Sequence, residues 1–117
     1  MKAVVEAPEP MKEDWAPATI LADLRGALQT ILNSKRYDLT VRQLAVLLEL
    51  STELRTIGQI ADALGISRPA CSQAVSRLVN LKLVERHRHN TGDLRLVMPI
   101  RTMAGHTFLE RIAGGKA

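Results

Sequence analysis

The sequence predicts a mainly α-helical domain that carries one small β-hairpin, and three observations within residues 56–98 predict it. A short capped helical segment runs into a glycine turn. A second capped helix follows this turn. Two alternating segments joined by turn-forming residues then predict a hairpin. Helix, turn, helix and hairpin in this order make a winged helix-turn-helix, which can present one helix to the major groove of DNA and a β-ribbon to the flanking groove.

The first of these helices is predicted to begin after Thr56 and to end at Gly65. Thr56 and Gln59 are three residues apart and form a capping box, in which each side chain satisfies a backbone N–H at the helix start. Apolar residues then recur at helical spacing, at Ile57, Ile60, Ala61 and Leu64. Gly65 tolerates the left-handed backbone that ends many helices.

The second helix is predicted over residues 68–81. Ser67 is a typical N-cap, and Pro69 falls in the first turn, where its missing N–H breaks no helical bond. Steps of 100° per residue gather the apolar side chains on one side, at Ala70, Cys71, Ala74, Val75 and Leu78. The other side is small, uncharged and flanked by arginines, and its candidate major-groove contacts are Ser67, Arg68, Pro69, Ser72, Gln73, Ser76, Arg77 and Asn80. Such groups can bind base edges or phosphates, although any exposed helix also has a polar face.

The hairpin is predicted to form the wing, over residues 84–97. Residues 83–89 predict its first strand, the alternation of Leu94, Leu96 and Met98 predicts the second, and residues 90–93 are dense in turn formers. Residues 55–101 hold eight Lys and Arg against three Asp and Glu, although the whole chain has a net charge of only +4. This concentration of charge indicates a phosphate-binding surface. Candidate DNA contacts in the wing are Arg86, Arg88, His89, Asp93 and Arg95.

Residues 17–113 are predicted to form a single domain, because 117 residues support one core and not two. A flexible leader at residues 1–16 and a disordered tail at residues 114–117 are expected to flank it. Three more helices are predicted, at residues 17–33, 40–51 and 102–113. The first and last of them are candidate dimer elements.

The helix at residues 17–33 has a sizeable apolar face, made of Ile20, Leu21, Leu24, Leu28, Ile31 and Leu32. Two interpretations stay open from the sequence. The face packs inside its own domain, or it forms an interface with a second subunit. Helical periodicity alone does not distinguish the two.

Nothing in the sequence assembles into an enzyme site or calls for a cofactor. It has no glycine-rich phosphate loop and no arguable nucleophile with its base. His87, His89 and Glu85 are too few for a typical zinc site, so no metal is expected. A single cysteine, Cys71, excludes an internal disulfide and is expected to be buried and inert. No run of residues is long and apolar enough to span a membrane, and a cytoplasmic location is expected.

These residues resemble the winged-helix regulators of the multiple-antibiotic-resistance regulator (MarR) family, over about residues 18–112. The resemblance is carried by five motifs in order: Leu39-Thr40-x-x-Gln43, Thr56-x-x-Gln59-Ile60-Ala61-x-x-Leu64-Gly65-Ile66-Ser67, Leu83-Val84-Glu85-Arg86, Asp93-Leu94-Arg95 and Thr102-x-x-Gly105. It implies that residues 68–81 are the recognition helix. It also implies that Arg95 enters the minor groove and that Asp93 holds this arginine in place.

The chain departs from the family pattern at several positions. Lys82 stands where the family usually has glycine, which predicts a wider turn before the wing. Leu94 replaces the commoner arginine and removes one phosphate contact, and Arg101 replaces a usual leucine. Family members usually continue well past position 117, with two C-terminal helices that form the dimer.

The sequence therefore predicts a regulator that binds double-stranded DNA as a homodimer and represses transcription by occluding a promoter. Two alternatives remain. One is a protein-interaction module that docks on another protein through the helix at residues 17–33. The other is a sensor gated by a small-molecule effector, which is less favoured because little helix is left to build a ligand pocket.

Overall fold

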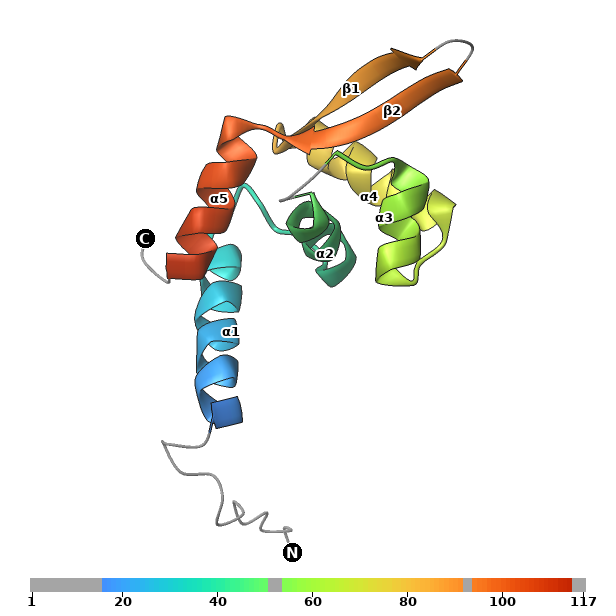
Figure 1. The fold of residues 1–117 in the computed structure, drawn as a ribbon. Helices are drawn as coiled ribbons and strands as arrows, with labels where there is room; N and C mark the ends of the chain where they lie inside the picture. Colours follow the sequence, from blue (N-terminus) through green and yellow to red (C-terminus); the bar gives the residue numbers. More distant parts are fainter. Residues whose placement is uncertain (1–15, 51–53, 92–93, 115–117) are drawn as a thin grey trace, which may run out of the picture.

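The computed structural model describes residues 16–50, 54–91 and 94–114, with the side chains of residue 16 and of residues 89–97 left aside. Five helices and one hairpin follow in the order that Figure 1 shows. They are α1 (Ala16–Asn33), α2 (Val41–Glu49), α3 (Ile57–Leu64), α4 (Arg68–Asn80), β1 (Val84–Thr91), β2 (Leu94–Arg101) and α5 (Met103–Gly114). The fold is thus the predicted one, mainly α with a two-stranded antiparallel wing.

The predicted helix starts are confirmed, because each depends on short-range contacts. Both capping boxes form: Thr40 with Gln43 before α2, and Thr56 with Gln59 before α3. Ser67 caps α4 by accepting a hydrogen bond from the backbone N–H of Ala70. These side chains satisfy backbone donors that have no partner within the helix.

Several predicted ends need correction. Helix α2 stops at Glu49, α4 stops at Asn80, and strand β2 continues beyond residue 97 to Arg101. Of the predicted turn at residues 90–93, Asn90 and Thr91 belong to β1, where Thr91 pairs with Leu94, and residues 92–93 lie outside the described residues. Of the predicted leader, residues 1–15 lie outside the described residues and Ala16 already belongs to α1; of the predicted tail, Gly114 belongs to α5 and residues 115–117 lie outside.

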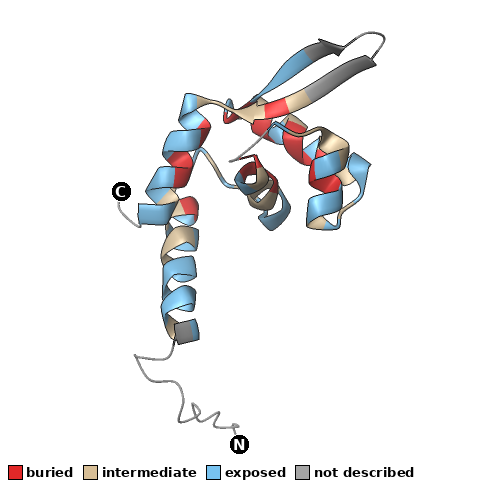
Figure 2. Cartoon of the chain, viewed as in Figure 1, coloured by how far each residue is buried: buried red, intermediate tan, exposed pale blue. Residues whose placement is uncertain are grey.

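The core lies where α2, α3 and α4 meet under the root of the wing, and Figure 2 shows buried positions on all three helices. It is almost entirely aliphatic, with Phe108 of α5 as its one buried aromatic residue among those described. The large side chains in it with almost no exposure include Leu47, Ile60, Leu78, Leu83 and Val84. The core therefore fixes α4 and the start of β1 together.

The turn between α4 and β1 is tight, not wide as the Lys82 substitution predicted. Lys82 adopts the left-handed conformation, with φ 69°. Its N–H donates to the carbonyl of Val79 at 2.9 Å, and the N–H of Leu83 donates to the carbonyl of Leu78 at 3.0 Å. These two bonds make the Schellman motif that usually has glycine at the left-handed position. The core contacts of Leu78 and Leu83 hold the turn closed in spite of the lysine.

The start of α5 is fastened to this same turn. The Thr102 hydroxyl donates to the carbonyl of Lys82 at 2.7 Å, and the Thr102 N–H donates to the carbonyl of Leu83 at 3.0 Å. Gly105, one turn into α5, is buried against Leu83. The root of the wing is thus bonded on both sides, to α4 and to α5.

Helix α1 extends away from the rest of the fold, beside α5 (Figure 1). Of its apolar face only Ile31 is buried. The other five members are between 42% and 69% exposed, and we call them the α1 apolar face: Ile20, Leu21, Leu24, Leu28 and Leu32. The interpretation of this face as part of the core of its own domain is therefore wrong for all but Ile31.

Candidate nucleic-acid interface

Helices α3 and α4 are joined by a turn that sets the direction of α4. Gly65 is left-handed, with φ 70°, as its position predicted. The N–H of Ile66 returns to the carbonyl of Ala61 at 3.0 Å, so the chain reverses within two residues. Ser67 then caps α4 at once. A glycine turn directly followed by an N-cap holds the two helices in a fixed helix-turn-helix arrangement.

Helix α4 buries the side that the sequence predicted. Cys71, Ala74, Val75 and Leu78 are buried, and Ala70 is half-buried. The eight predicted contact residues all keep some solvent exposure. Ser72 and Ser76 are half-buried, and the exposed ones are Ser67, Arg68, Pro69, Gln73, Arg77 and Asn80. We call these eight residues the α4 outer face.

The α4 outer face is suited to hydrogen bonding within a groove. Ser72, Gln73 and Ser76 offer short donors and acceptors and carry no charge. Arg68 and Arg77 lie at its two flanks. Amides and hydroxyls can bind base edges, whereas flanking guanidinium groups can bind guanine or phosphate.

Arg68 is packed against the start of α3. A Cβ added to Gly58 would lie 3.1 Å from the guanidinium carbon of Arg68, so the absence of a side chain at Gly58 leaves room for this group. The sequence singled out Arg68 but not Gly58. A helix-start glycine opposite an N-terminal arginine of the next helix became recognisable only from the structure.

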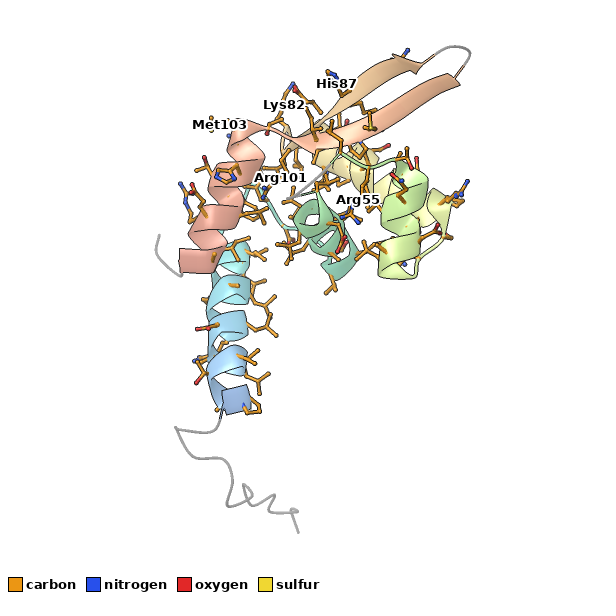
Figure 3. All side chains as sticks on the ribbon, viewed as in Figure 1. Arg55, Lys82, His87, Arg101 and Met103 are labelled. Atoms are coloured by element: carbon orange, nitrogen blue, oxygen red, sulfur yellow. The ribbon has the colours of Figure 1, made fainter. Side chains whose placement is uncertain are left out.

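The wing is an antiparallel pair in which Arg86 is opposite Pro99 and His87 is opposite Met98. Alternation along β1 places Val84, Arg86 and Arg88 on one face, as predicted. Val84 is buried against the core, and the Arg86 guanidinium reaches α4, where it donates to the Ser76 hydroxyl at 2.7 Å. His87 projects from the opposite side of β1, as Figure 3 shows.

The other predicted wing residues are described only in part. Arg88 is exposed. His89 and Arg95 have described backbones within the ladder, where Arg95 is opposite Asn90, but their side chains lie outside the described part. Asp93 lies outside the described residues altogether. The contacts proposed for these three side chains therefore stay predictions.

One ion pair braces the helices beneath this surface. Arg55 precedes α3 and donates both to the Glu49 carboxylate and to the Glu49 backbone carbonyl at the end of α2. Figure 3 shows Arg55 between α2 and α3. A cation at the C-terminus of a helix also interacts favourably with the helix dipole. No motif in the sequence predicts this contact.

Among the described residues, no three His, Cys, Asp or Glu side chains come close enough to hold a metal ion. Cys71 is buried, and loss of hydration raises the pKa of its thiol above the ordinary value of 9.0. The thiol therefore stays in its unreactive, protonated form.

Across the described residues, every helix is too short or too polar to cross a lipid bilayer.

Taken together, the helix-turn-helix, the wing and the α4 outer face define a winged-helix DNA-binding protein. The family model of the MarR family matches residues 37–95, from just before α2 into β2, and the chain belongs to this family. The MarR family consists of winged-helix transcription regulators, so family and fold identify a DNA-binding transcription regulator. Proteins of this family and fold are generally not enzymes.

Solved structures have the same fold. The protein RV1404 of Mycobacterium tuberculosis superposes with a TM-score of 0.73 and 21% identity, over 97% of this chain and 77% of that one. A mutant of MepR from S. aureus, bound to an oligodeoxyribonucleotide, has a TM-score of 0.65 and 19% identity, over 88% and 76%. The homodimeric winged helix-turn-helix DNA-binding domain Mb0332 of Mycobacterium bovis has a TM-score of 0.52 and 22% identity, over 87% and 82%. No protein of curated function has a significantly similar sequence.

Proposed function

We propose that the protein binds double-stranded DNA as a homodimer, with α4 in the major groove and the wing on the adjacent minor groove, and that it represses transcription. The α4 outer face carries this proposal. It is uncharged at its centre and flanked by arginines, and each of its residues keeps some exposure to solvent. An α-helix fits the major groove of B-DNA, and only there do base edges distinguish all four base pairs.

The side chains of α4 are assigned by their place on the helix. Ser72, Gln73 and Ser76 face the base edges, and Gln73 has the paired donor and acceptor that suit adenine. Arg68 and Arg77 bind guanine or the phosphates on either side. Ser67, Pro69 and Asn80 complete the contact surface at its ends.

The wing supplies cations to the backbone of the DNA. Arg88 is exposed on the face of β1 that Val84 and Arg86 share, two residues further toward the tip. Arg95 is assigned to the minor groove through the family resemblance, with Asp93 as its support, and His89 is assigned to the phosphates beside the wing. A narrow minor groove attracts such an arginine through its negative potential.

The α1 apolar face supports the homodimer. Five large aliphatic side chains along one helix, each at least 42% exposed, form a surface that water solvates poorly. Pairing of this face with that of a second copy, with α5 alongside, would bury it. A twofold axis would then place two α4 helices on half-sites about 34–36 Å apart, one turn of the double helix.

The same face is what the main alternative would use. A protein-interaction module would dock α1 on a different protein and would not need a reading helix. The α4 outer face and the eight Lys and Arg of residues 55–101 favour DNA binding, since neither serves a docking role for α1. We also propose that the protein works without catalysis and without a cofactor, in the cytoplasm with the DNA it reads.

Duplex binding over a range of salt concentrations tests this function. We expect retention of a labelled random duplex, with a logarithm of affinity that falls linearly as the logarithm of salt concentration rises, because bound phosphates release counterions. Single-stranded DNA of the same length should bind more weakly, since the described residues offer no aromatic platform for stacking bases. Failure to bind any duplex at low salt would favour the interaction module.

A further inference from the structure

Arg86 is one of the predicted wing contacts, and its exposed side chain also makes a hydrogen bond within the protein. Its Nη2 donates to Oγ of Ser76 at 2.7 Å. Arg86 comes from the wing and Ser76 from the middle of the α4 outer face. This side-chain hydrogen bond joins the two DNA-binding elements.

The position of Arg86 is set by two buried neighbours, one on its own strand and one on the partner strand. Val84, two residues earlier on the same face of β1, is 2% exposed and belongs to the core. Pro99, the residue opposite Arg86 in β2, is also fully buried. The Arg86 backbone therefore starts from a rigid part of the wing, and its side chain spans the corner between β1 and α4.

The bond determines what Ser76 can offer to a ligand. A hydroxyl has one donor and two acceptor positions. Because the oxygen of Ser76 accepts from Arg86, its proton is oriented away from the guanidinium. Within the described part of the chain, no acceptor takes that proton. Ser76 thus presents an O–H donor on the α4 outer face, where an acceptor such as O6 or N7 of guanine, N7 of adenine or O4 of thymine would lie.

We propose that Arg86 is a positioning residue for sequence recognition: it holds the Ser76 hydroxyl as a donor to an acceptor on one base pair, and it fixes the wing relative to α4. This inference rests on the proposed function and assigns to Arg86 a role other than neutralising a phosphate. A phosphate contact strengthens binding to all sequences alike, whereas a positioned donor discriminates between base pairs. The two roles therefore differ in measurable ways.

The test compares Arg86→Ala, Ser76→Ala and the double variant by fluorescence anisotropy. The probes are a duplex obtained by selection with the wild-type protein and a panel with each base pair changed in turn. We expect both single variants to lose discrimination at the same base pair, by about 3- to 10-fold, as the loss of one hydrogen bond implies. The double variant should lose no more than Ser76→Ala alone, because both changes remove one donor.

Two controls separate positioning from charge and from misfolding. Ser76→Thr keeps the hydroxyl and should keep the preference. Arg88→Ala removes a cation two residues along the same strand, and it should lower the salt slope by about one unit with the base preference kept. Arg86→Ala should leave that slope unchanged. A slope lowered by about one unit in Arg86→Ala, with the preference intact and multiplicative losses in the double variant, would overturn the proposal.

The free protein offers a second test that does not depend on DNA. A double-mutant cycle of urea unfolding should show Arg86 and Ser76 coupled by about twofold or more in the folding equilibrium constant. Independent effects would overturn the proposal even if DNA binds normally. Coupled residues in a protein that binds no duplex would instead count against the proposed function and leave the contact standing.

Discussion

Gly105 of α5 lies so close to the carbonyl oxygen of Leu83 that a Cβ on Gly105 would come within 3.0 Å of it. The oxygen belongs to the backbone and is already bonded to the Thr102 N–H, so it has little freedom to move. This contact joins α5 to the root of the wing. It explains why a glycine three residues after Thr102 matters for the orientation of α5.

Replacing Gly105 by alanine should therefore destabilise the fold. We expect the free energy of unfolding to fall by about 1–3 kcal/mol, the usual cost of forcing an extra carbon into a packed site. Urea unfolding followed by circular dichroism measures it. Gly26→Ala is the matched control, because Gly26 is also helical and has nothing within 4 Å of an added Cβ. That change should raise stability by about 0.5–1 kcal/mol, and equal effects at the two glycines would contradict the packing found here.

Lys82→Gly should stabilise the protein. A left-handed backbone destabilises a residue that has a side chain by roughly 1–2 kcal/mol, and glycine removes this strain. Glycine also makes the unfolded chain more flexible, which offsets about 0.5–1 kcal/mol of the stabilisation. The net rise in unfolding free energy should be about 0.5–1 kcal/mol. Lys82→Ala keeps the strain and removes the charge, so it should change stability by less than about 0.5 kcal/mol. If Lys82→Gly proves no more stable than Lys82→Ala, the turn is not strained.

The α1 apolar face should control the oligomeric state. Leu24→Glu places a charge in the middle of this face and should shift sedimentation from dimer to monomer, since a buried, unpaired carboxylate is costly. Gln29→Glu adds the same charge to an exposed position about 140° around the helix from Leu24 and should leave the dimer intact. A dimer that survives Leu24→Glu would place the subunit interface elsewhere.

Cys71 should be inert in the folded protein. The aromatic disulfide reagent DTNB should react with it only after addition of denaturant, whereas Gln73→Cys, on the exposed side of the same helix, should add one fast-reacting thiol. Burial raises the pKa of the Cys71 thiol, so the neutral form is favoured by folding. The sign of the pH effect follows: this contribution to stability is full below the ordinary pKa of 9.0 and is lost as the pH rises above it. Rapid labelling of the native wild type would contradict this account.

The two kinds of DNA contact should respond differently to substitution. Arg95→Ala should weaken binding to all sequences and lower the salt slope by about one unit, because it removes one cation from the phosphates. Gln73→Ala should instead relax the sequence preference, with little change in slope, because it removes a base contact. Anisotropy titrations over a salt series, on a specific and a random duplex, measure both. Identical behaviour of the two variants would show that the contacts are assigned wrongly.

Features set by neighbouring residues could be predicted from the sequence. Thr56 with Gln59, Gly65 and Ser67 fix helix ends through contacts within a few residues, and the structure has each of them as expected. The end of β2 was missed although Ile100 continues the alternation of Leu94, Leu96 and Met98, because Pro99 has no backbone N–H and proline is unfavourable within a strand. The tight turn at Lys82 was missed because its cause is distant: core packing of Leu78 and Leu83 outweighs the preference of the turn for glycine.

In the functional surface, too, local features could be predicted from the sequence and contacts between distant segments could not. Periodicity along α4 separated its buried side from its outer face correctly. It could not show that Arg86 reaches Ser76, since that contact depends on how the wing leans over α4. Periodicity along α1 likewise could not show whether the α1 apolar face lies inside the domain. A helix with this pattern can be covered by its own domain or by a second subunit.

The most direct test of the central claim, that the α4 outer face reads duplex DNA, is a selection of binding sites from random duplexes by the wild-type protein and by Gln73→Ala. We predict that the wild type enriches a pseudo-palindrome with half-site centres about 10–10.5 base pairs apart, and that Gln73→Ala loses the preference at one position in each half-site. Recovery of no motif by the wild type, or of the same motif with undiminished preference by Gln73→Ala, would contradict it.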